Sequence, residues 1–230
     1  MTPLVSVIIP TRNRASLLRE TLNSVLCQEY GAREIIVIDD GSEDGTGELC
    51  REFPVHYVRT TQRGRSAARN AGASAAAGDL LAFLDDDDLW PEGSLSLRVR
   101  RWEEDPECHH LVGRVRRFRV DSEGDVSFLD DERQARHMVG VGAGVMLRKA
   151  FFAAGGFDES LSTDEDTDLW FRMKAAGMRL RMIPEICLHY RRHEGNTTSS
   201  HEEIDGQHAS LLRSLRRKIV NNRLSGATIP

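Results

Sequence analysis

Short apolar runs alternate with segments of helical period along the first part of the chain. Leucine and valine recur at intervals of three and four from Leu17 to Leu26, and an alanine-rich helical stretch ends at Gly78. The apolar runs are short and rich in β-branched residues, so we interpret them as buried strands over residues 4–9, 34–40, 55–58 and 80–84. Alternation of strand and helix is typical of parallel strands joined by right-handed crossovers.

The second half of the chain is less regular. Its patterns predict an amphipathic helix, an alternating strand, a strand with a short helix and a Gly-Gly turn, and a final helix, over residues 94–105, 111–120, 141–161 and 165–177. A basic amphipathic helix follows near the end. Because no repeat or linker is visible, we expect a single α/β domain over residues 1–195, with a mostly parallel sheet flanked by helices and a smaller mixed subregion, and a helical tail over residues 196–230.

Polar segments follow three of the predicted strands. They read PTRNR after the first strand, DDGS after the second and DDDD after the fourth. The carboxyl ends of parallel strands meet at one edge of the sheet, and α/β proteins bind their ligands there. Convergence of these three segments therefore predicts the binding site of the domain at that edge.

The acidic run Asp85–Asp88 is the most unusual of these segments. Adjacent carboxylates repel one another and are stabilised only by water, by cationic side chains or by a metal ion. An isolated acidic turn is usually just solvated, but this one follows a buried strand at the expected ligand edge. Oxygen donors of this kind suit Mg²⁺ or Mn²⁺ bound together with substrate phosphates. The run therefore favours a metal–diphosphate site.

Spacing excludes several other kinds of site. The segment DDGSEDGTG matches the start of a calcium loop, but Arg51 stands where that loop needs a bidentate glutamate. No GxGxxG follows the first strand and no GxxxxGK[ST] occurs, which argues against a Rossmann dehydrogenase and a P-loop NTPase. The four cysteines are scattered without the spacing of a zinc site.

Two further clusters can complete the site. Arg63, Arg65 and Arg69 lie near a predicted helix start, where they either balance the aspartates, contact a diphosphate or are simply solvated. The segment DEDTDLW places Glu165 and Asp166 at another helix N-terminus. The helix dipole alone can explain acidic residues there, but a carboxylate across the crevice can also act as a general base.

Charge and composition limit the kinds of partner that we expect the protein to bind. The net charge of −5 and the pI of about 5.9 do not indicate a nucleic-acid-binding protein. The N-terminal apolar run has no basic region before it and is too short to span a bilayer, so we expect a cytoplasmic protein. The basic C-terminal helix permits peripheral contact with the inner face of a membrane, although docking on the core or on a partner explains it more simply. The oligomeric state is not specified by any of these features.

Five segments in order resemble the inverting family-two glycosyltransferases of the GT-A fold. They are VSVIIPTRNR, IIVIDDGSEDGT, ARNAGASAAAGDLLAFLDDDDLWP, GGFDE and EDTDLWFR. The resemblance implies a nucleotide-binding half over residues 1–90 and a donor-sugar and acceptor half over residues 91–195. It implies transfer of a sugar from a nucleoside-diphosphate sugar, with UDP favoured, to a hydroxyl of a carbohydrate or lipid-linked acceptor in cell-envelope polysaccharide biosynthesis.

The resemblance also implies roles for individual residues. Together with the arginines, it leads us to expect nucleotide contacts from Pro10, Thr11, Arg12, Asp40, Arg65, Arg69, Asp85 and Asp86. Within this set, Asp40 matches the carboxylate that bonds the uracil ring. Asp85 and Asp87 match the two ends of the DxD motif of the family, with Asp87 as the direct ligand of Mn²⁺ or Mg²⁺, and His193 matches a position that sometimes reaches the metal.

The implied reaction is a single displacement. Asp166, next to Glu165, matches the catalytic base that takes the proton of the acceptor hydroxyl as its oxygen attacks the anomeric carbon from the face opposite the nucleotide. The metal neutralises charge on the leaving diphosphate. Two alternatives are kept. One is a catalytically silent module of the same fold that binds a nucleotide sugar or a partner, and the other is a metal-dependent phosphohydrolase.

Overall fold

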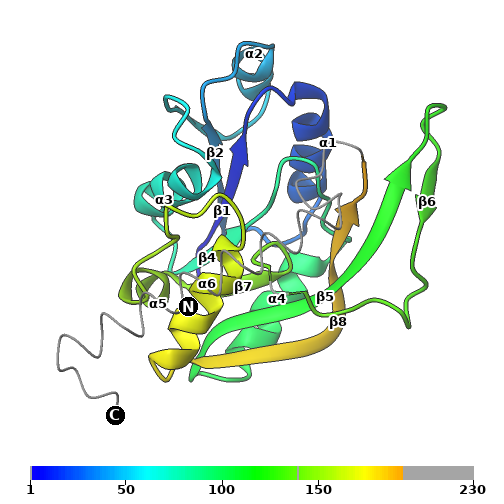
Figure 1. Cartoon of the computed structure of the whole chain (residues 1–230). Helices are drawn as coiled ribbons and strands as arrows, with labels where there is room; N and C mark the ends of the chain where they lie inside the picture. The colour runs from blue at the N-terminus through cyan, green and yellow to red at the C-terminus, as the bar shows by residue number, and fades with distance from the viewer. Residues whose placement is uncertain (1, 139, 194–230) are drawn as a thin grey trace. The chain divides into compact units, whose positions relative to one another are not determined.

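The structure, a computed structural model, describes residues 2–138 and 140–193. Within this range the residues up to Arg192 belong to one structural unit, whose elements are labelled in Figure 1. The predicted helical tail over residues 196–230 lies outside the described residues.

A mixed sheet of eight strands forms the centre of this unit. The strands are β1 (Val5–Thr11), β2 (Arg33–Asp39), β3 (His56–Arg59), β4 (Leu80–Phe83), β5 (Cys108–Val120), β6 (Val126–Phe128), β7 (Gly144–Leu147) and β8 (Arg179–Arg191). They follow the order β3-β2-β1-β4-β7-β5-β6, with β8 paired to β5. All pairs among β1 to β4 are parallel, whereas β7 is antiparallel to both β4 and β5. The predicted parallel sheet with a smaller mixed subregion is therefore confirmed.

Helices cover both faces of the sheet. They are α1 (Ala15–Leu26), α2 (Thr46–Cys50), α3 (Arg65–Ala75), α4 (Ser94–Glu103), α5 (Arg148–Ala153) and α6 (Glu165–Ala175). Because side chains alternate along a strand, Val7 and Ile9 pack with α1, α2 and α4, whereas Ile8 packs with α3, α5 and α6 on the other face. None of these helices is long and apolar enough to cross a membrane.

Strand β8 is absent from the sequence-based expectations. Leu180, Met182, Ile186, Leu188 and Tyr190 alternate with mostly polar residues, but Pro184 interrupts the pattern, and no strand is predicted there. In the structure β8 (orange in Figure 1) runs beside β5 (green), and between the pairs Val112–Met182 and Arg114–Ile186 the register shifts. This irregularity contains Pro184, which is a position where a sheet tolerates proline.

Close packing of α3 on β1 depends on Gly72. A Cβ atom at this position would lie 2.4 Å from Ile8 Cγ2 and 3.2 Å from Ile38 Cγ1. Both distances are shorter than an ordinary van der Waals contact between carbon atoms. We expect Gly72→Ala to lower the free energy of unfolding by about 1–3 kcal/mol, although alanine is the better helix former. Urea denaturation measures this change, with exposed Ser74→Ala on the same helix as the control. Equal stability of the two variants would mean that α3 shifts without cost, contrary to this account.

Candidate active site

The carboxyl ends of β1, β2 and β4 meet at one edge of the sheet, as the strand pattern predicts. In the register of β1 and β2, Thr11 lies beside Asp39, so both strands end at the same level. Thr11 Oγ1 donates a hydrogen bond of 2.7 Å to Asp86 Oδ2, which joins the end of β1 to the turn that follows β4. Pro10 and Thr11 are buried, whereas Arg12 is exposed at this edge.

Arg14 balances the middle of the acidic turn Asp85–Asp88. Its Nη1 atom donates to Asp86 Oδ1 at 3.1 Å and to Asp87 Oδ2 at 2.7 Å. Burial raises the pKa of Asp86 to about 6, although Arg14 opposes the shift. The Arg14 side chain is 33% exposed, so part of it is accessible to solvent. Arg14 is not among the predicted site residues; the only signal for it is that an acidic run needs cations from neighbouring strand ends.

Asp88 closes the turn from the side of β8. It is 2% exposed, and its Oδ1 atom accepts a hydrogen bond of 2.9 Å from the backbone N–H of Arg191. Arg191 Nε donates to the carbonyl oxygen of Asp87 at 2.8 Å. Burial, with Asp87 and Asp85 nearby, raises the pKa of Asp88 well above its usual value. Arg191 thus links the last described strand to the acidic turn, a contact that no sequence motif indicates.

Asp40 is held at the end of β2 by the loop that precedes α3. Its Oδ1 atom accepts hydrogen bonds from Thr60 Oγ1 at 2.8 Å and from Arg63 N at 2.9 Å, and its Oδ2 atom accepts one from Gly64 N at 2.8 Å. Burial alone would raise the pKa of Asp40, but these bonds and nearby Arg12 outweigh it and lower the pKa. A carboxylate offers about four acceptor positions, so this anion can accept one more donor, such as the N–H of a base.

Arg69 of α3 is the buried centre of the site. Its Nη2 atom contacts Asp85 Oδ1 at 2.5 Å, and its Nη1 atom contacts Glu165 Oε1 and Asp166 Oδ1, each at 3.0 Å. The Arg69 side chain is only 2% exposed. Arg65 Nε lies 2.7 Å from the same Glu165 Oε1 atom. One guanidinium therefore joins the turn after β4 to the first residues of α6, and five predicted site residues lie together.

The carboxylates around Arg69 differ in their affinity for protons. Burial would raise the pKa of Asp85, but Arg69 and Arg65 outweigh it and lower the pKa. Burial raises the pKa of Asp166 to about 6, in spite of Arg69 and with help from the charge of Glu165. Neighbouring carboxyl groups with diverging pKa values indicate a division of roles. Asp85 stays an anion, whereas Asp166 can take and release a proton near neutral pH.

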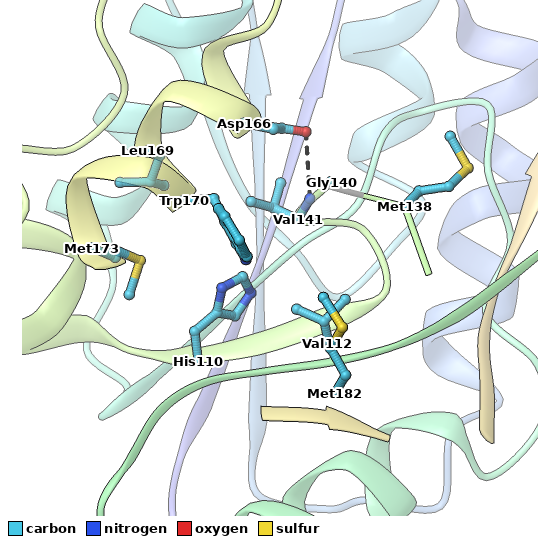
Figure 2. A pocket seen from close by; sticks show the side chains of 10 residues that line it. All are labelled: His110, Val112, Met138, Gly140, Val141, Asp166, Leu169, Trp170, Met173 and Met182. Carbon is cyan, nitrogen blue, oxygen red and sulfur yellow. Dashed lines mark hydrogen bonds between the residues drawn. The ribbon is translucent and has the colours of Figure 1, made fainter. Parts of the chain in front are cut away.

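Asp166 faces a hollow with mostly apolar walls, shown in Figure 2. The Asp166 side chain is 22% exposed, and its Oδ2 atom accepts a hydrogen bond of 3.4 Å from Val141 N. The walls come from β5, α6, β8 and the segment before β7, and include His110, Val112, Val141, Leu169, Trp170 and Met182.

Oxygen donors for a divalent cation are present at the acidic turn. Mg²⁺ and Mn²⁺ typically take one or two protein carboxylates and complete their shell with water and substrate phosphates, and Asp85 and Asp87 provide such carboxylates. Arg14 already lies 2.7 Å from Asp87, at a position that calls for positive charge. Among the described residues no three His, Cys, Asp or Glu side chains converge on one point. His193 begins a second unit of the chain, and its role as a ligand stays a prediction.

Comparison with known protein families identifies relatives of the chain. The model of "Glycosyl transferase family 2" matches residues 6–148, and that of "Glycosyl transferase family group 2" matches residues 80–218. The glycosyltransferase AglE of Haloferax volcanii is 43% identical over 93 residues, which cover 37% of this chain and 31% of that protein. The chain thus matches less than a third of that relative's length.

Solved structures share the fold. Mannosyltransferase PcManGT from Pyrobaculum calidifontis, in complex with GDP-Man and Mn²⁺, has a TM-score of 0.69 at 22% identity, over 85% of this chain and 59% of that one. Residues 1–349 of S. aureus TarS, in complex with UDP-GlcNAc, have a TM-score of 0.68 at 20% identity, over 86% and 61%. The GT-A fold expected from the sequence is thereby confirmed. Because one family model covers more than half of the sequence, the chain belongs to glycosyl transferase family 2.

Proposed function

We propose that this domain transfers a sugar from a nucleoside-diphosphate sugar to an acceptor hydroxyl, with inversion at the anomeric carbon. The observation that carries the proposal is the shared guanidinium of Arg69, which holds Asp85 and Asp166 at 2.5 and 3.0 Å. A donor-side carboxylate and a proton acceptor are thereby fixed relative to each other. Fixed geometry of this kind is what lowers the barrier of a two-substrate reaction.

Asp166 is the proton acceptor in this proposal. Its pKa of about 6 lies near the working pH, where a general base is most effective. As the acceptor oxygen forms its bond to the anomeric carbon, the bond from that carbon to the diphosphate breaks, and the hydroxyl proton passes to Asp166. Glu165 is 3% exposed and bonded to Arg65 and Arg69, so it orients the start of α6 rather than meeting the acceptor.

The nucleotide lies at the carboxyl edge of β1, β2 and β4. Asp40 bonds the base, with Pro10, Thr11 and Arg12 beside it, and Arg65 is exposed enough to meet the diphosphate, at 36%. UDP is the favoured nucleotide, and complexes of TarS with UDP-GlcNAc and of PcManGT with GDP-Man support a donor of this class. Asp85 and Asp87 would hold Mn²⁺ or Mg²⁺, which when bound neutralises charge on the leaving diphosphate.

A thermal-shift panel of UDP, GDP, dTDP and CDP, each with Mn²⁺ and with EDTA, tests the donor part of this proposal. A ligand at about a hundred times its dissociation constant stabilises a protein by about 2.7 kcal/mol, which is readily measured. We expect stabilisation by UDP in the presence of metal, and release of UDP when a UDP-sugar donor and an acceptor are both supplied. Absence of a shift with every nucleotide would refute the proposal, and binding without turnover would favour a catalytically silent module.

Asp87→Asn is expected to abolish the metal-dependent part of this stabilisation. Asparagine keeps the shape of the side chain but lacks the anionic oxygens that Mg²⁺ and Mn²⁺ prefer. The thermal shift of the variant with UDP and Mn²⁺ should equal that of the wild type with UDP and EDTA. Asp125→Asn, an exposed change on the β5–β6 connection, is the control and should keep the full shift. A full thermal shift in Asp87→Asn would mean that Asp87 is not a ligand of the metal.

A further inference from the structure

A buried arginine on α4 lacks an anionic partner. Arg98 is 0% exposed, and no carboxylate among the described residues pairs with it. Its Nη2 atom has no hydrogen-bond partner in the same part of the chain. Burial lowers the pKa of the guanidinium to about 10, so it still carries its charge at neutral pH. Burying an unpaired charge costs free energy, and a contribution to stability therefore does not explain Arg98.

Arg98 lies against Trp90 and two backbone carbonyl groups. The guanidinium carbon is 4.0 Å from the centre of the Trp90 ring, which is well within the range of cation–π attraction. Arg98 Nη1 donates to the carbonyl oxygen of Gly144 at 3.0 Å, and Nε donates to that of Ser94 at 3.2 Å. Trp90 is buried too, and its Nε1 atom donates to the carbonyl oxygen of Gly142 at 3.1 Å. The two side chains therefore hold the same short turn.

Residues 141–144 form this turn, which leads into β7 and which we call the glycine turn. The carbonyl oxygen of Val141 accepts a hydrogen bond from Gly144 N at 3.1 Å, and that of Ala143 accepts one from Gly113 N at 3.0 Å. The indole and the guanidinium hold the other two carbonyl oxygens. Each of the four carbonyl groups thus has a donor, and two of these donors are the side chains of Trp90 and Arg98.

The glycine turn directs one backbone N–H group at the proposed base. Val141 N donates to Asp166 Oδ2 at 3.4 Å, the bond drawn as a dashed line in Figure 2. Asp166 Oδ1 accepts its bond from Arg69, so the two oxygens of this carboxylate are held by different elements. A length of 3.4 Å is near the upper limit for such a bond, and a displacement of the turn by about half an ångström would break it. The orientation of Asp166 therefore depends on where the glycine turn is held.

We propose that Trp90 and Arg98 are positioning residues for Asp166, because they hold the glycine turn whose Val141 N–H orients the carboxylate for proton transfer. Trp90 comes two residues after Asp88, so it connects the acidic turn to the base by a path that does not include Arg69. This inference rests on the proposed function for the role of Asp166, but the contact made by Val141 N is measurable without any transfer.

Trp90→Phe removes the bond to the Gly142 carbonyl and keeps an aromatic face for Arg98. We expect kcat for sugar transfer to fall about 10- to 100-fold while KM for the donor stays unchanged, because a small displacement of a catalytic group is costly. Trp102→Phe is the matched control. Trp102 Nε1 donates to the carbonyl oxygen of Cys108 at 2.9 Å, so this variant loses the same kind of bond but should keep its kcat. Equal rates in the two variants would overturn the proposal.

A double variant separates positioning from general damage. Asp166→Asn leaves no base to orient, so adding Trp90→Phe should slow the residual transfer by less than about twofold. If the effects of the two changes multiplied in full, Trp90 would act independently of Asp166, contrary to the proposal.

Arg98→Lys tests the second positioning residue, and it does so even if Trp90→Phe does not fold. Lysine keeps the charge but lacks the planar fork that stacks on an indole and bonds two carbonyl groups at once. We expect about a tenfold lower kcat at unchanged KM for the donor. Arg101→Lys is the control on the same helix, since Arg101 pairs with Glu104 and Glu185 near the surface. An unchanged kcat in Arg98→Lys would remove Arg98 from the assignment.

The amide resonance of Val141 provides a readout that needs no turnover. A bond to a carboxylate is charge-assisted and moves an amide proton downfield, so this proton should move upfield in both Trp90→Phe and Asp166→Asn. The Trp102→Phe spectrum should keep the wild-type position. An unmoved Val141 amide in Trp90→Phe would overturn the inference even if transfer slowed. Absence of sugar transfer by the wild type would refute the proposed function, whereas normal transfer by Trp90→Phe would refute only this inference.

Discussion

Asp166→Asn is expected to slow sugar transfer by about 10²–10⁴-fold while donor binding stays unchanged. Asparagine has the same shape and can still accept the hydrogen bond that Arg69 Nη1 donates to Asp166 Oδ1 at 3.0 Å. It cannot, however, take the proton of an attacking hydroxyl. The measurement is the initial rate of nucleotide release with donor and acceptor both present, together with the thermal shift by the nucleotide alone.

The pH dependence of the wild type provides a second readout of Asp166. Because its pKa is raised to about 6, the fraction of ionised base falls below that pH, and kcat/KM should decline on the acidic side. The stability effect has the opposite sign. A folded-state pKa above the ordinary 3.8 means that the folded protein favours the neutral carboxyl, so the stability present below pH 3.8 is lost as the pH rises through about 6.

Asp166→Asn is therefore expected to be at least as stable as the wild type at pH 7, and urea denaturation that shows this would exclude unfolding as the cause of inactivity. Asp125→Asn, on the exposed β5–β6 connection, is the control and should keep full activity. If Asp166→Asn retained more than about a tenth of the wild-type rate, another group would have to accept the proton. The acidic decline in kcat/KM should also be absent from whatever residual activity the variant has.

Local patterns predict the nucleotide-binding half well. The apolar run over residues 80–84 becomes β4 over Leu80–Phe83, and the alanine-rich stretch becomes α3 over Arg65–Ala75. In this half each strand is followed by a turn and a helix, so period and turn chemistry point to the same elements. The convergence of Thr11, Asp40 and the acidic turn then follows from the topology of parallel strands alone.

The contacts that complete the site are not visible in local patterns. Arg14 resembles any solvated arginine, and its role depends on Asp86, which is 72 positions away in the sequence. Arg191 belongs to β8, and only the folded position of β8 beside β5 brings its side chain to the acidic turn. His110 lies just before the strand predicted over residues 111–120, where the sequence gives it no special role. Only the structure shows that its ring nitrogens are buried without a hydrogen-bond partner among the described residues. Such roles arise from long-range packing, which a single sequence does not encode locally.

Arg69→Met is expected to lower the free energy of unfolding by about 3–5 kcal/mol at pH 7. Methionine keeps much of the apolar length of the side chain but removes the charge shared by Asp85, Glu165 and Asp166. These carboxylates would then repel one another around a buried position, with Arg65 still paired to Glu165. Urea denaturation is the appropriate measurement, because guanidinium would itself screen the charges.

Arg65→Met is the matched control for Arg69→Met. Both arginines contact Glu165 Oε1, at 2.7 Å for Arg65 and 3.0 Å for Arg69, but the Arg65 side chain is 36% exposed and that of Arg69 only 2%. Solvent screens the exposed pair, so Arg65→Met should cost at most about 1 kcal/mol. Similar losses in the two variants would mean that burial of the guanidinium is not what makes Arg69 important.

The cost of Arg69→Met should also shrink as the pH falls. In the wild type the lowered pKa of Asp85 means that its pairing with Arg69 contributes stability above the ordinary pKa of the carboxyl, and this contribution is lost in acid. Without Arg69 the clustered carboxyl groups should protonate at higher pH, which relieves their repulsion.

Combining Arg69→Met with Asp166→Asn removes one of the repelling charges and should recover part of the lost stability at pH 7. If Asp166→Asn changed the stability of Arg69→Met by the same amount as it changes that of the wild type, the two residues would not be coupled. Coupling, by contrast, would mean that the residue proposed to take the proton and the turn proposed to bind the donor are held in place by the same buried charge.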